Sequence, residues 1–458
     1  MTNSELKGRR VAVLGLGKEG LDLVRFLCRQ GASVTVLDQN TAAQLGNNYK
    51  QAKKFGAKFK LGDMHLDGLE IFEIIFRSPG VPLQLPEIKK AKRAGVKISS
   101  AIKLFFDLCP AKIVAVTGTK GKSTTASLIY HLLKGGRSRV FLAGNIGKPP
   151  LALIGRLQRK DTVVLELSSF QLEDLHKSPQ IAVWLNVVPE HLDRHKNFSS
   201  YLAAKKNIIK HQRGQDWLIV SRDFAGSRKS LKDAKGKVFI YSLNKVLKRG
   251  LYIAKGDIVY RTLDSGKRQV VTKVSDITLK GKHNLQNVLS AIAVAVLSGV
   301  SLKQIARKLT AFKPLEHRLE LAREIGDVIF INDSLGTTPE AAAAAAQAFA
   351  YRDTAMIVGG VYKGGDIVKM AKDMAKHGVK FVALIGKSAS KFERIFKRHA
   401  PDVATKKFST FKSAIKEAYN QVRTNGGVVI LSPACASFDM FKNAYKRGKE
   451  FKDIVKSL

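Results

Sequence analysis

The segment from Thr117 to Thr124 has the composition of a loop that binds the phosphates of a nucleotide. It reads TGTKGKST and lies between an apolar run that predicts a strand and a run that predicts a helix. Backbone N–H groups of such a loop surround phosphate oxygens, a lysine neutralises their charge, and a hydroxyl reaches Mg²⁺. The usual GxxxxGK[ST] pattern would need glycine at Val116, so this loop is a shifted variant. The candidate phosphate contacts are Gly118, Thr119, Lys120, Gly121, Lys122, Ser123 and Thr124.

Two later apolar runs end in side chains that could bind a metal ion beside these phosphates. Glu166 follows the run VVL, and His191 lies in NVVPEHLDRH. Mg²⁺ in proteins prefers carboxylate and other oxygen ligands. A single strand-end glutamate or a lone histidine is more often structural. Parallel strands of one sheet, however, present their carboxyl ends at the same edge, and this shared position favours a site.

A glycine-rich turn near the N-terminus predicts a binding site for a nucleoside diphosphate. An apolar run precedes the turn GLGKEG, and a helix and a second strand, Ser33 to Leu37, follow it and end at Asp38. This order is typical of a dinucleotide-binding βαβ unit, although a turn without a ligand is the alternative. A later predicted strand runs into a second loop, SPG. The candidate residues are Gly15, Gly17, Lys18, Glu19, Asp38, Ser78, Pro79 and Gly80.

Strands that alternate with helices predict an α/β protein of three domains, with boundaries at 1–107, 108–311 and 312–458. The first and third domains are expected to be Rossmann-like. The central domain is expected to hold a P-loop-type, mostly parallel sheet with a small β excursion over 216–280. In the third domain Thr338, Pro339 and Glu340 predict the start of an alanine-rich helix.

The charge of the chain raises the question of a nucleic-acid partner. Its 458 residues include 79 Lys and Arg against 37 Asp and Glu, a net charge of +42. The basic residues are spread along the whole chain and accompany no zinc-finger or RNP-like motif, so no dedicated nucleic-acid partner is expected. The three cysteines, Cys28, Cys109 and Cys435, are far apart and predict neither a metal site nor disulfides. With no secretory segment and no membrane-spanning run, we expect a cytoplasmic monomer without a membrane partner.

Several longer motifs occur in an order that resembles the Mur ligase family. They are LELSSFQLE, NVVPEHLDRH, AAKKN, GKHNLQN, EHRLE, NDS, GG-x-x-KGGD and SPACASFDMFKNAYKRGKEF, and the resemblance extends from about residue 8 to the C-terminus. Within the family, the chain resembles the ligases that add glutamate to UDP-N-acetylmuramoyl-L-alanine. The resemblance implies an ATP-dependent, amide-bond-forming ligase of peptidoglycan precursor synthesis, which forms an acyl phosphate and releases ADP and phosphate.

The resemblance also implies a role for individual residues. The N-terminal domain would hold the UDP group, and Asn145 would contact the muramoyl group. Lys122 and Ser123 would bind ATP and Mg²⁺, with Glu166 on the same ion and His191 on a second one. Lys205 aligns with the lysine that this family carbamoylates, a change that turns a cation into an oxygen ligand. On the nucleotide side the implied residues are Asn284, Asn287, Arg318 and Asp333, and on the substrate side they are His317, Thr337, Lys363, Ser437 and Phe438.

The chain departs from the usual glutamate-adding pattern at four places. Lys120 replaces a common asparagine, the pair Lys18-Glu19 is more charged than usual, Leu335 replaces a lysine, and Ala444 stands where an aromatic residue is often found. The last two concern the amino-acid pocket and make an L-glutamate-adding variant the alternative to the expected D-glutamate. The sequence is also compatible with a different Mur or folylpolyglutamate-type ligase, with a basic nucleic-acid-binding NTPase and with a non-catalytic UDP-sugar binder.

Overall fold

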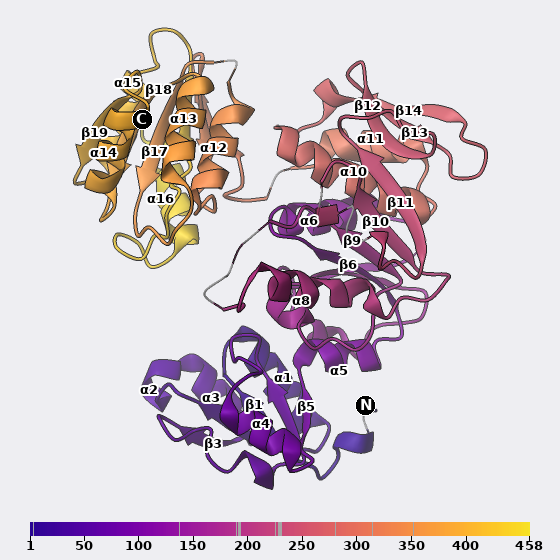
Figure 1. Ribbon diagram of the computed structural model, residues 1–458. Helices are drawn as coiled ribbons and strands as arrows, with labels where there is room; N and C mark the ends of the chain where they lie inside the picture. Colours follow the sequence, from indigo (N-terminus) through magenta and orange to yellow (C-terminus); the bar gives the residue numbers. More distant parts are fainter. Residues whose placement is uncertain are drawn as a thin grey trace. The chain divides into compact units, whose positions relative to one another are not determined.

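The computed structural model contains three β-sheets in two compact units (Figure 1). Unit 1 comprises residues 1–275 and 286–309, and unit 2 comprises residues 276–285 and 310–458. The structure describes residues 1–2, 4–136, 138–188, 190, 194–224, 226–227, 231–279, 281–313, 315–350 and 352–458. This mixed α/β architecture, with mostly parallel sheets, confirms the predicted fold class.

The first sheet of unit 1 is parallel throughout, in the order β3-β2-β1-β4-β5. Alternate residues of β1 enter different cores: Val11 and Val13 pack on one face, and Ala12 and Leu14 on the other. The predicted βαβ unit is therefore confirmed. The strands are β1 (Arg10–Leu14), β2 (Ser33–Asp38), β3 (Lys58–Leu61), β4 (Ile74–Arg77) and β5 (Lys97–Ser99), and the helices are α1 (Lys18–Arg29), α2 (Ala42–Leu45), α3 (Asn47–Lys54), α4 (Pro86–Arg93) and α5 (Ala101–Leu108).

The second sheet of unit 1 has nine strands, in the order β14-β13-β12-β11-β10-β9-β6-β8-β7. Strands β6 to β12 pair in parallel, whereas β13 is antiparallel to both of its neighbours, β12 and β14. The β-rich stretch expected at 216–280 is present and extends this same sheet. The strands are β6 (Lys112–Thr117), β7 (Val140–Gly144), β8 (Thr162–Glu166), β9 (Ile181–Trp184), β10 (Trp217–Ser221), β11 (Lys237–Ser242), β12 (Gly250–Ala254), β13 (Asp257–Arg261) and β14 (Arg268–Lys273).

The helices that accompany this sheet begin at the positions where the loops of the site end. Helix α6 follows the phosphate loop directly, and α7 follows the end of β8. The apolar run around Val294 forms a buried helix. Their bounds are α6 (Lys122–Leu133), η3 (Pro150–Leu153), α7 (Ser169–Leu172), α8 (Phe198–Lys210), α10 (Lys282–Leu297) and α11 (Leu302–Ala311).

Unit 2 contains a six-stranded sheet, in the order β15-β16-β20-β17-β18-β19, with helices on both faces (Figure 1). Only β15 runs antiparallel to its neighbour. Thr338 caps α12 with its side chain and Pro339 opens the helix, as predicted. The strands are β15 (Glu320–Ile325), β16 (Val328–Asn332), β17 (Thr354–Gly359), β18 (Val379–Ile385), β19 (Ala404–Phe408) and β20 (Val428–Leu431), and the helices are α12 (Pro339–Ala348), α13 (Ile367–Lys376), α14 (Ala389–His399), α15 (Phe411–Asn420) and α16 (Ala444–Lys456).

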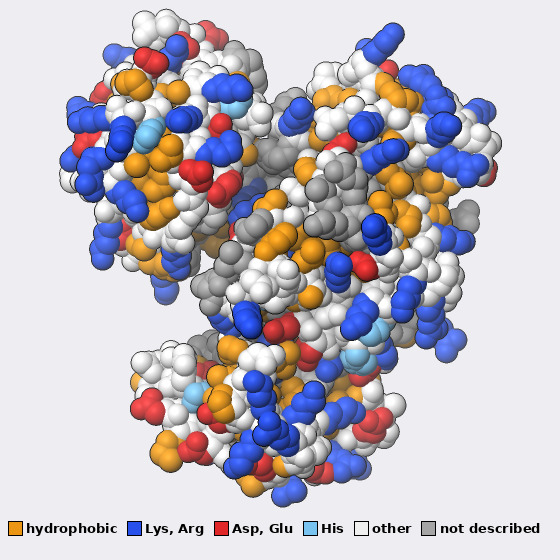
Figure 2. All heavy atoms as spheres, in the orientation of Figure 1, with side chains coloured by type: hydrophobic (Ala, Val, Ile, Leu, Met, Phe, Trp, Pro, Cys, Tyr) orange, Lys and Arg blue, Asp and Glu red, His pale blue; other side chains and the backbone are white. Residues whose placement is uncertain are grey.

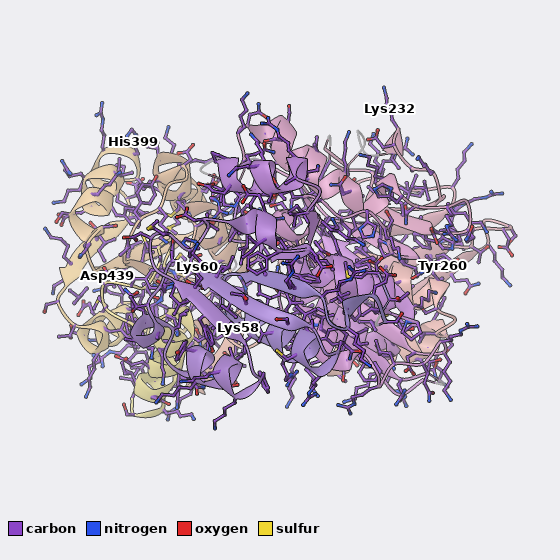
Figure 3. All side chains as sticks on the ribbon, turned by 90° about the horizontal axis from the view of Figure 1, so that it is seen from below. Lys58, Lys60, Lys232, Tyr260, His399 and Asp439 are labelled. Atoms are coloured by element: carbon purple, nitrogen blue, oxygen red, sulfur yellow. The ribbon has the colours of Figure 1, made fainter. Side chains whose placement is uncertain are left out.

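Basic side chains are distributed over the visible surface of both units, with acidic ones between them (Figure 2). Lys232, for example, is exposed and projects outward (Figure 3). This distribution agrees with the spread of lysine and arginine along the sequence. Within the described part of the chain, no helix combines the length and the apolar character needed to cross a bilayer.

Candidate functional site

The predicted phosphate loop connects β6 to α6, and its two glycines are required by close contacts. A Cβ atom at Gly118 would lie 2.6 Å from the Cβ of Leu185, at the end of the neighbouring strand. Gly121 has a φ of +84°, and a Cβ there would collide with the amide of Asn287. The loop therefore has a shape that other residue types cannot adopt without displacing its neighbours. Its backbone N–H groups lie at the start of a helix, where they can bind phosphate oxygens.

Two lysines meet at the carbonyl oxygen of Gly118. The amine of Lys122 donates to this oxygen at 3.0 Å and to the carbonyl of Thr119 at 2.8 Å. The amine of Lys205, which comes from α8, donates to the oxygen of Gly118 at 2.8 Å. These two lysines are far apart in the sequence. The fold thus brings both predicted catalytic lysines to one atom of the phosphate loop.

Lys205 is almost completely buried, with a side chain of which 1% is exposed. Burial lowers the pKa of its amine well below the usual value, and the charge of Lys122 lowers it further. The carboxylates of Glu190 and Glu166 act in the opposite direction but do not offset this. Because a low pKa favours the unprotonated amine, Lys205 has the character of a nucleophile rather than of a solvated cation.

Tyr201 belongs to the same site, although no motif of the sequence identified it. Its hydroxyl lies 3.0 Å from the hydroxyl of Thr119 in the phosphate loop. The amine of Lys205, one turn further along α8, lies 4.7 Å from the centre of its ring. The spacing of four residues between Tyr201 and Lys205 is a signal that could have found it, because residues i and i+4 share a helix face.

Lys120 forms an ion pair with Glu190. The side chain of Lys120 is 54% exposed, which is typical of a loop cation in contact with solvent. Lys120, which replaces the more common asparagine, therefore adds a positive charge that the carboxylate of Glu190 balances. The two lysines of the loop thus have different surroundings, and only Lys122 contacts the loop carbonyls.

Glu166 ends β8 with a buried carboxylate that fits a cation. Its Oε2 atom is buried and accepts no hydrogen bond from the described residues. A buried carboxylate oxygen without a partner is costly unless a ligand contacts it, and Mg²⁺ prefers such oxygens. The described residues contain no cluster of three or more His, Cys, Asp and Glu side chains that could hold a metal by themselves. His191 lies outside the described residues.

The remaining candidates of unit 1 lie at the ends of neighbouring elements. Ser123 and Thr124 are half-buried in the first turn of α6. Asn145 is exposed directly after β7, and its backbone N–H donates to the carbonyl of Glu166 at 3.1 Å. Asn287 is buried beneath the phosphate loop and accepts a hydrogen bond from Thr125 at 3.1 Å. Ser123, Thr124 and Asn287 therefore lie at the phosphate loop, and Asn145 lies beside Glu166 at the end of β8.

The glycine turn of the first sheet lines a cavity of about 620 Å³. All of the candidates predicted for this domain line it, namely Gly15, Gly17, Lys18, Glu19, Asp38, Ser78, Pro79 and Gly80. The Asp38 carboxylate accepts hydrogen bonds from the backbone N–H of Leu16 at 2.7 Å and from Asn40 at 2.9 Å. Asp38 therefore holds the turn in shape, in addition to any contact it makes with a ligand. The volume is in the range of small-molecule sites.

Glu19 connects this turn to the second sheet. Its Oε2 atom accepts a hydrogen bond at 3.0 Å from the side chain of Gln171 in α7. Burial raises the pKa of Glu19, whereas Gln171 and the charge of Arg77 act in the opposite direction. The guanidinium of Arg77 in turn lies 3.4 Å from the carboxylate of Asp174. Motifs in the sequence did not predict these links, because they join residues that are far apart along the chain.

In unit 2, Arg318 and Asp333 of the predicted nucleotide-side residues lie near the end of β16. The buried Asp333 accepts hydrogen bonds from Ser432 at 2.7 Å and from the backbone of Leu319 at 3.3 Å. Arg318 donates to the carbonyl of Leu335 at 2.9 Å. His317 is buried with a φ of +63°. Asn284 is buried and belongs to the short segment 276–285 of the same unit.

His317 has a mainly structural environment. Its Nδ1 atom lies 2.9 Å from the amide nitrogen of Asn332, and its backbone N–H donates to Glu320 at 2.8 Å. A Cβ atom at Gly448 in α16 would collide with its ring. Burial lowers the pKa of His317, so the neutral ring is favoured. These contacts fix the segment that carries Arg318.

The environment of Asp333 predicts a pH-dependent stability of unit 2. Burial raises the pKa of Asp333 to about 6 from 3.8, although the charge of Arg318 lowers it. A raised pKa means that this carboxyl stabilises the fold below about pH 4 and that the contribution is lost as the pH rises through about 6. Relative to Asp333→Asn, the unmodified protein is expected to be about 2 kcal/mol more stable at pH 4 than at pH 7.

Hydrogen exchange of the β16 and β20 amides would measure these free energies of unfolding at both pH values. Asp402→Asn, at an exposed position of the same unit, is the control and should show no such difference. A pH-independent difference for Asp333→Asn would contradict the raised pKa.

The candidates for the amino-acid pocket lie in loops of unit 2. The amine of Lys363 lies 5.1 Å from the ring centre of Phe438, and that residue is 66% exposed. Ser437 is buried, and Thr337 is half-buried before α12. At two of the departures from the usual pattern, a backbone carbonyl accepts a hydrogen bond. The carbonyl of Leu335 accepts one from Arg318 at 2.9 Å, and the carbonyl of Ala444 accepts one from Ser334 at 2.7 Å.

The comparisons with known proteins cover all three sheets. Residues 9–100 match the family model of the Mur ligase MurD-like N-terminal domain. Residues 116–295 match the Mur ligase middle domain, and residues 317–435 match the Mur ligase glutamate ligase domain. The phosphate loop, Glu166 and Lys205 lie within the second of these segments.

Curated relatives match over nearly the whole chain. A UDP-N-acetylmuramoylalanine--D-glutamate ligase of Acetivibrio thermocellus is 40% identical over 99% of this chain and 97% of its own length. A ligase of the same name from Clostridium tetani is 38% identical over 98% of this chain and 97% of its own length.

Solved structures share the fold at lower sequence identity. The UDP-N-acetylmuramate-alanine ligase MurC of Thermotoga maritima has a TM-score of 0.60 and 16% identity over 98% of this chain and 99% of that chain. The MurF ligase of the same organism, in complex with ADP, has a TM-score of 0.60 and 18% identity over 100% of this chain and 97% of that chain. The full-length relatives and the three domain models together show that this chain belongs to the Mur ligase family.

Proposed function

We propose that this protein is an ATP-dependent ligase that joins D-glutamate to UDP-N-acetylmuramoyl-L-alanine, a step of peptidoglycan precursor synthesis. The observation that carries the substrate assignment is the 40% identity, over nearly the full length, to a relative named for this reaction. The phosphate loop with its two converging lysines supports the use of ATP. The choice of D-glutamate over the L-enantiomer follows the names of the relatives, because the departures at Leu335 and Ala444 carry no information about the enantiomer.

The reaction begins with activation of the alanyl carboxylate, because a carboxylate is a poor acyl donor to an amine. The γ-phosphoryl group of ATP is transferred to it, which forms an acyl phosphate and ADP. Lys122 offsets negative charge on the transferring group, and backbone N–H groups of the loop orient the phosphates. The amine of glutamate then attacks the acyl carbon, and phosphate leaves from the tetrahedral intermediate. The site must exclude water, because water would hydrolyse the acyl phosphate.

Mg²⁺ would be held by the hydroxyl of Ser123 and the carboxylate of Glu166, and a second ion by His191. When bound, such ions neutralise charge on the phosphate oxygens. Lys205 is proposed to be carbamoylated: its neutral amine forms a bond to the carbon of CO₂ and releases a proton. The Lys205 side chain, which ended in a basic amine, would then end in a carboxylate-like group that can serve as an oxygen ligand. The lowered pKa of Lys205 supports this reaction, because only the unprotonated amine attacks CO₂.

The substrate contacts of the proposal follow the family assignment. The cavity at the glycine turn would hold the UDP group, with Asn145 at the muramoyl group. Asn284 and Asn287 would face adenine, and Arg318 and Asp333 the ribose and phosphates, supported by His317. Thr337, Lys363, Ser437 and Phe438 would surround glutamate. The domain boundaries at 107/108 and 311/312, a monomeric state and a cytoplasmic location are part of the same proposal.

Release of inorganic phosphate tests this function directly. Purified protein is mixed with ATP, Mg²⁺ and UDP-N-acetylmuramoyl-L-alanine, and D-glutamate, L-glutamate or another amino acid is supplied in turn. Release is expected with D-glutamate and should require all four components. Release with L-glutamate alone would overturn the enantiomer, and no release with any amino acid would overturn the ligase assignment.

A further inference from the structure

One cavity of unit 1 shares Lys18 with the cavity at the glycine turn and is lined by no residue of the phosphate loop. It has a volume of about 800 Å³ and is lined by α1, by α3 and by the segment 148–156, which includes η3. Helices α1 and α3 lie side by side in the first domain (Figure 1). The segment 148–156 belongs to the second sheet region and follows Asn145 by only three residues. The cavity is therefore built from two sheet regions of the same unit.

The wall of this cavity is strongly basic. Five cations line it, namely Lys18, Arg25, Arg29, Lys148 and Arg156, against a single acidic residue. That residue, Asp22, is buried and already bound: Arg25 donates to it at 2.6 Å, and the backbone N–H of Ala152 donates at 3.2 Å. The wall therefore carries an excess of positive charge, which a bound anion can neutralise.

Three of these cations are available for a ligand. Within the described part of the chain, the side chains of Arg29, Lys148 and Arg156 form no ion pair, and Arg25 pairs only with Asp22. Like charges that face one cavity repel each other, so an anion between them lowers the electrostatic energy. Arginine also presents a planar set of donors that matches the oxygens of a phosphate.

Apolar side chains and three amides, Gln30, Asn48 and Gln51, form the rest of the wall. Of the apolar side chains, Leu21 and Phe55 are half-buried and offer surface to a ligand, whereas Phe26 and Leu151 are buried. A bare inorganic anion would leave this apolar surface in contact with water. A ligand with an apolar or aromatic body attached to the anionic group would cover it.

We infer that this cavity is a second ligand site, which binds an organic monophosphate through Arg29, Lys148 and Arg156 and packs the apolar part of that ligand against Leu21 and Phe55. The site is distinct from the two that the proposed ligase reaction uses. Only Lys18 lines both this cavity and the cavity at the glycine turn. Binding here does not depend on the identity of the ligase substrates.

The fluorescent anion 8-anilino-1-naphthalenesulfonate has the required combination of a charged group and an aromatic body and serves as the probe. Its fluorescence is titrated with the full-length protein and with Arg29→Gln/Arg156→Gln. The dissociation constant is expected to rise at least about tenfold in this double variant, because two charge-assisted contacts are lost. The control is Arg93→Gln/Arg398→Gln, which removes the same charge at exposed positions outside the cavity and should leave the constant unchanged.

Two further measurements locate the probe and define the ligand. Hydrogen exchange with bound probe should show protection in α1 and in 148–156. The Lys122→Ala variant should bind the probe as the unmodified protein does, which separates this site from the ligase reaction. Uridine monophosphate and octyl phosphate distinguish an aromatic from an aliphatic ligand, and displacement by either supports the inference.

Three results would overturn the inference. The first is equal probe binding by Arg29→Gln/Arg156→Gln and its control. The second is protection confined to the phosphate loop or to the glycine turn. The third is displacement by inorganic phosphate at the same concentrations as the organic phosphates, because the apolar half of the cavity would then contribute nothing. Equal thermal midpoints of the two double variants establish that both are folded.

Discussion

Replacing Lys205 with alanine is expected to lower kcat for phosphate release by roughly 10²- to 10³-fold, the size of effect seen when one group that stabilises transition-state charge is removed. The reason is the position of its amine, 2.8 Å from the carbonyl of Gly118 in the phosphate loop and buried from solvent. The lowered pKa of this amine favours the unprotonated form that reacts with CO₂. The alanine variant would lack the resulting oxygen ligand.

Short carboxylates provide the decisive control for this variant. Acetate or formate can occupy the space left by the side chain and supply an oxygen ligand, so partial recovery of kcat is expected. Lys206→Ala removes the neighbouring lysine, which pairs with Asp233 at 2.8 Å, and should retain most of the activity. Full activity of Lys205→Ala without any added carboxylate would refute the carbamate role, and mass spectrometry of the unmodified protein under CO₂ would test the modification itself.

Replacing Lys122 with alanine is expected to have a comparable effect, again roughly 10²- to 10³-fold on kcat/KM for ATP. The amine of Lys122 is held by the carbonyls of Gly118 and Thr119, at the centre of the loop that faces the phosphates. Its loss removes positive charge at the point where the phosphoryl group is transferred. Phosphate release at varied ATP concentration measures the change.

Lys120, two positions earlier in the same loop, is the matched comparison. Its side chain is half exposed and paired with Glu190, so Lys120→Ala is expected to lower kcat/KM for ATP only about threefold, the size of effect expected from a weak surface interaction. An equal loss in Lys120→Ala and Lys122→Ala would mean that the loop responds to net charge alone. That result would contradict the separate environments of the two lysines.

Both predictions concern lysines that contact the same carbonyl, that of Gly118, and burying the amine of Lys205 there costs free energy. Burial and the charge of Lys122 both disfavour the protonated amine of Lys205, and the nearby carboxylates of Glu190 and Glu166 do not fully compensate. A carbamate would place a negative group beside Lys122 and remove this conflict. Perturbed groups of this kind concentrate at functional sites because catalysis requires unusual protonation states.

Unit 2 shows the same principle at another position. Asp333 is buried with a raised pKa, and its oxygens are held by Ser432 and by the backbone of Leu319. The free energy that this arrangement costs at neutral pH is expected to be recovered when the carboxylate binds a ligand. Ligand binding at this position would therefore stabilise unit 2 more at pH 7 than at pH 4.

The sequence by itself determined the features that depend on neighbouring residues. The strand–loop–helix order around residues 117–124, the glycine turn before α1 and the capped start of α12 were predicted correctly, because glycine, proline and threonine act on the backbone within a few positions. Strand ends such as Glu166 and Ser78 were also placed correctly. The family assignment followed from motifs that were read in order along the chain.

Only the tertiary structure decided which distant side chains share an environment. The contact between Lys205 and Gly118 joins residues 87 positions apart, and the link between Glu19 and Gln171 joins residues 152 apart. The hydroxyl pair of Thr119 and Tyr201 and the basic cavity along α1 depend in the same way on the packing of separate elements. Burial, and with it the pKa of Lys205, is a property of the assembled core, and local sequence patterns carry no information about it.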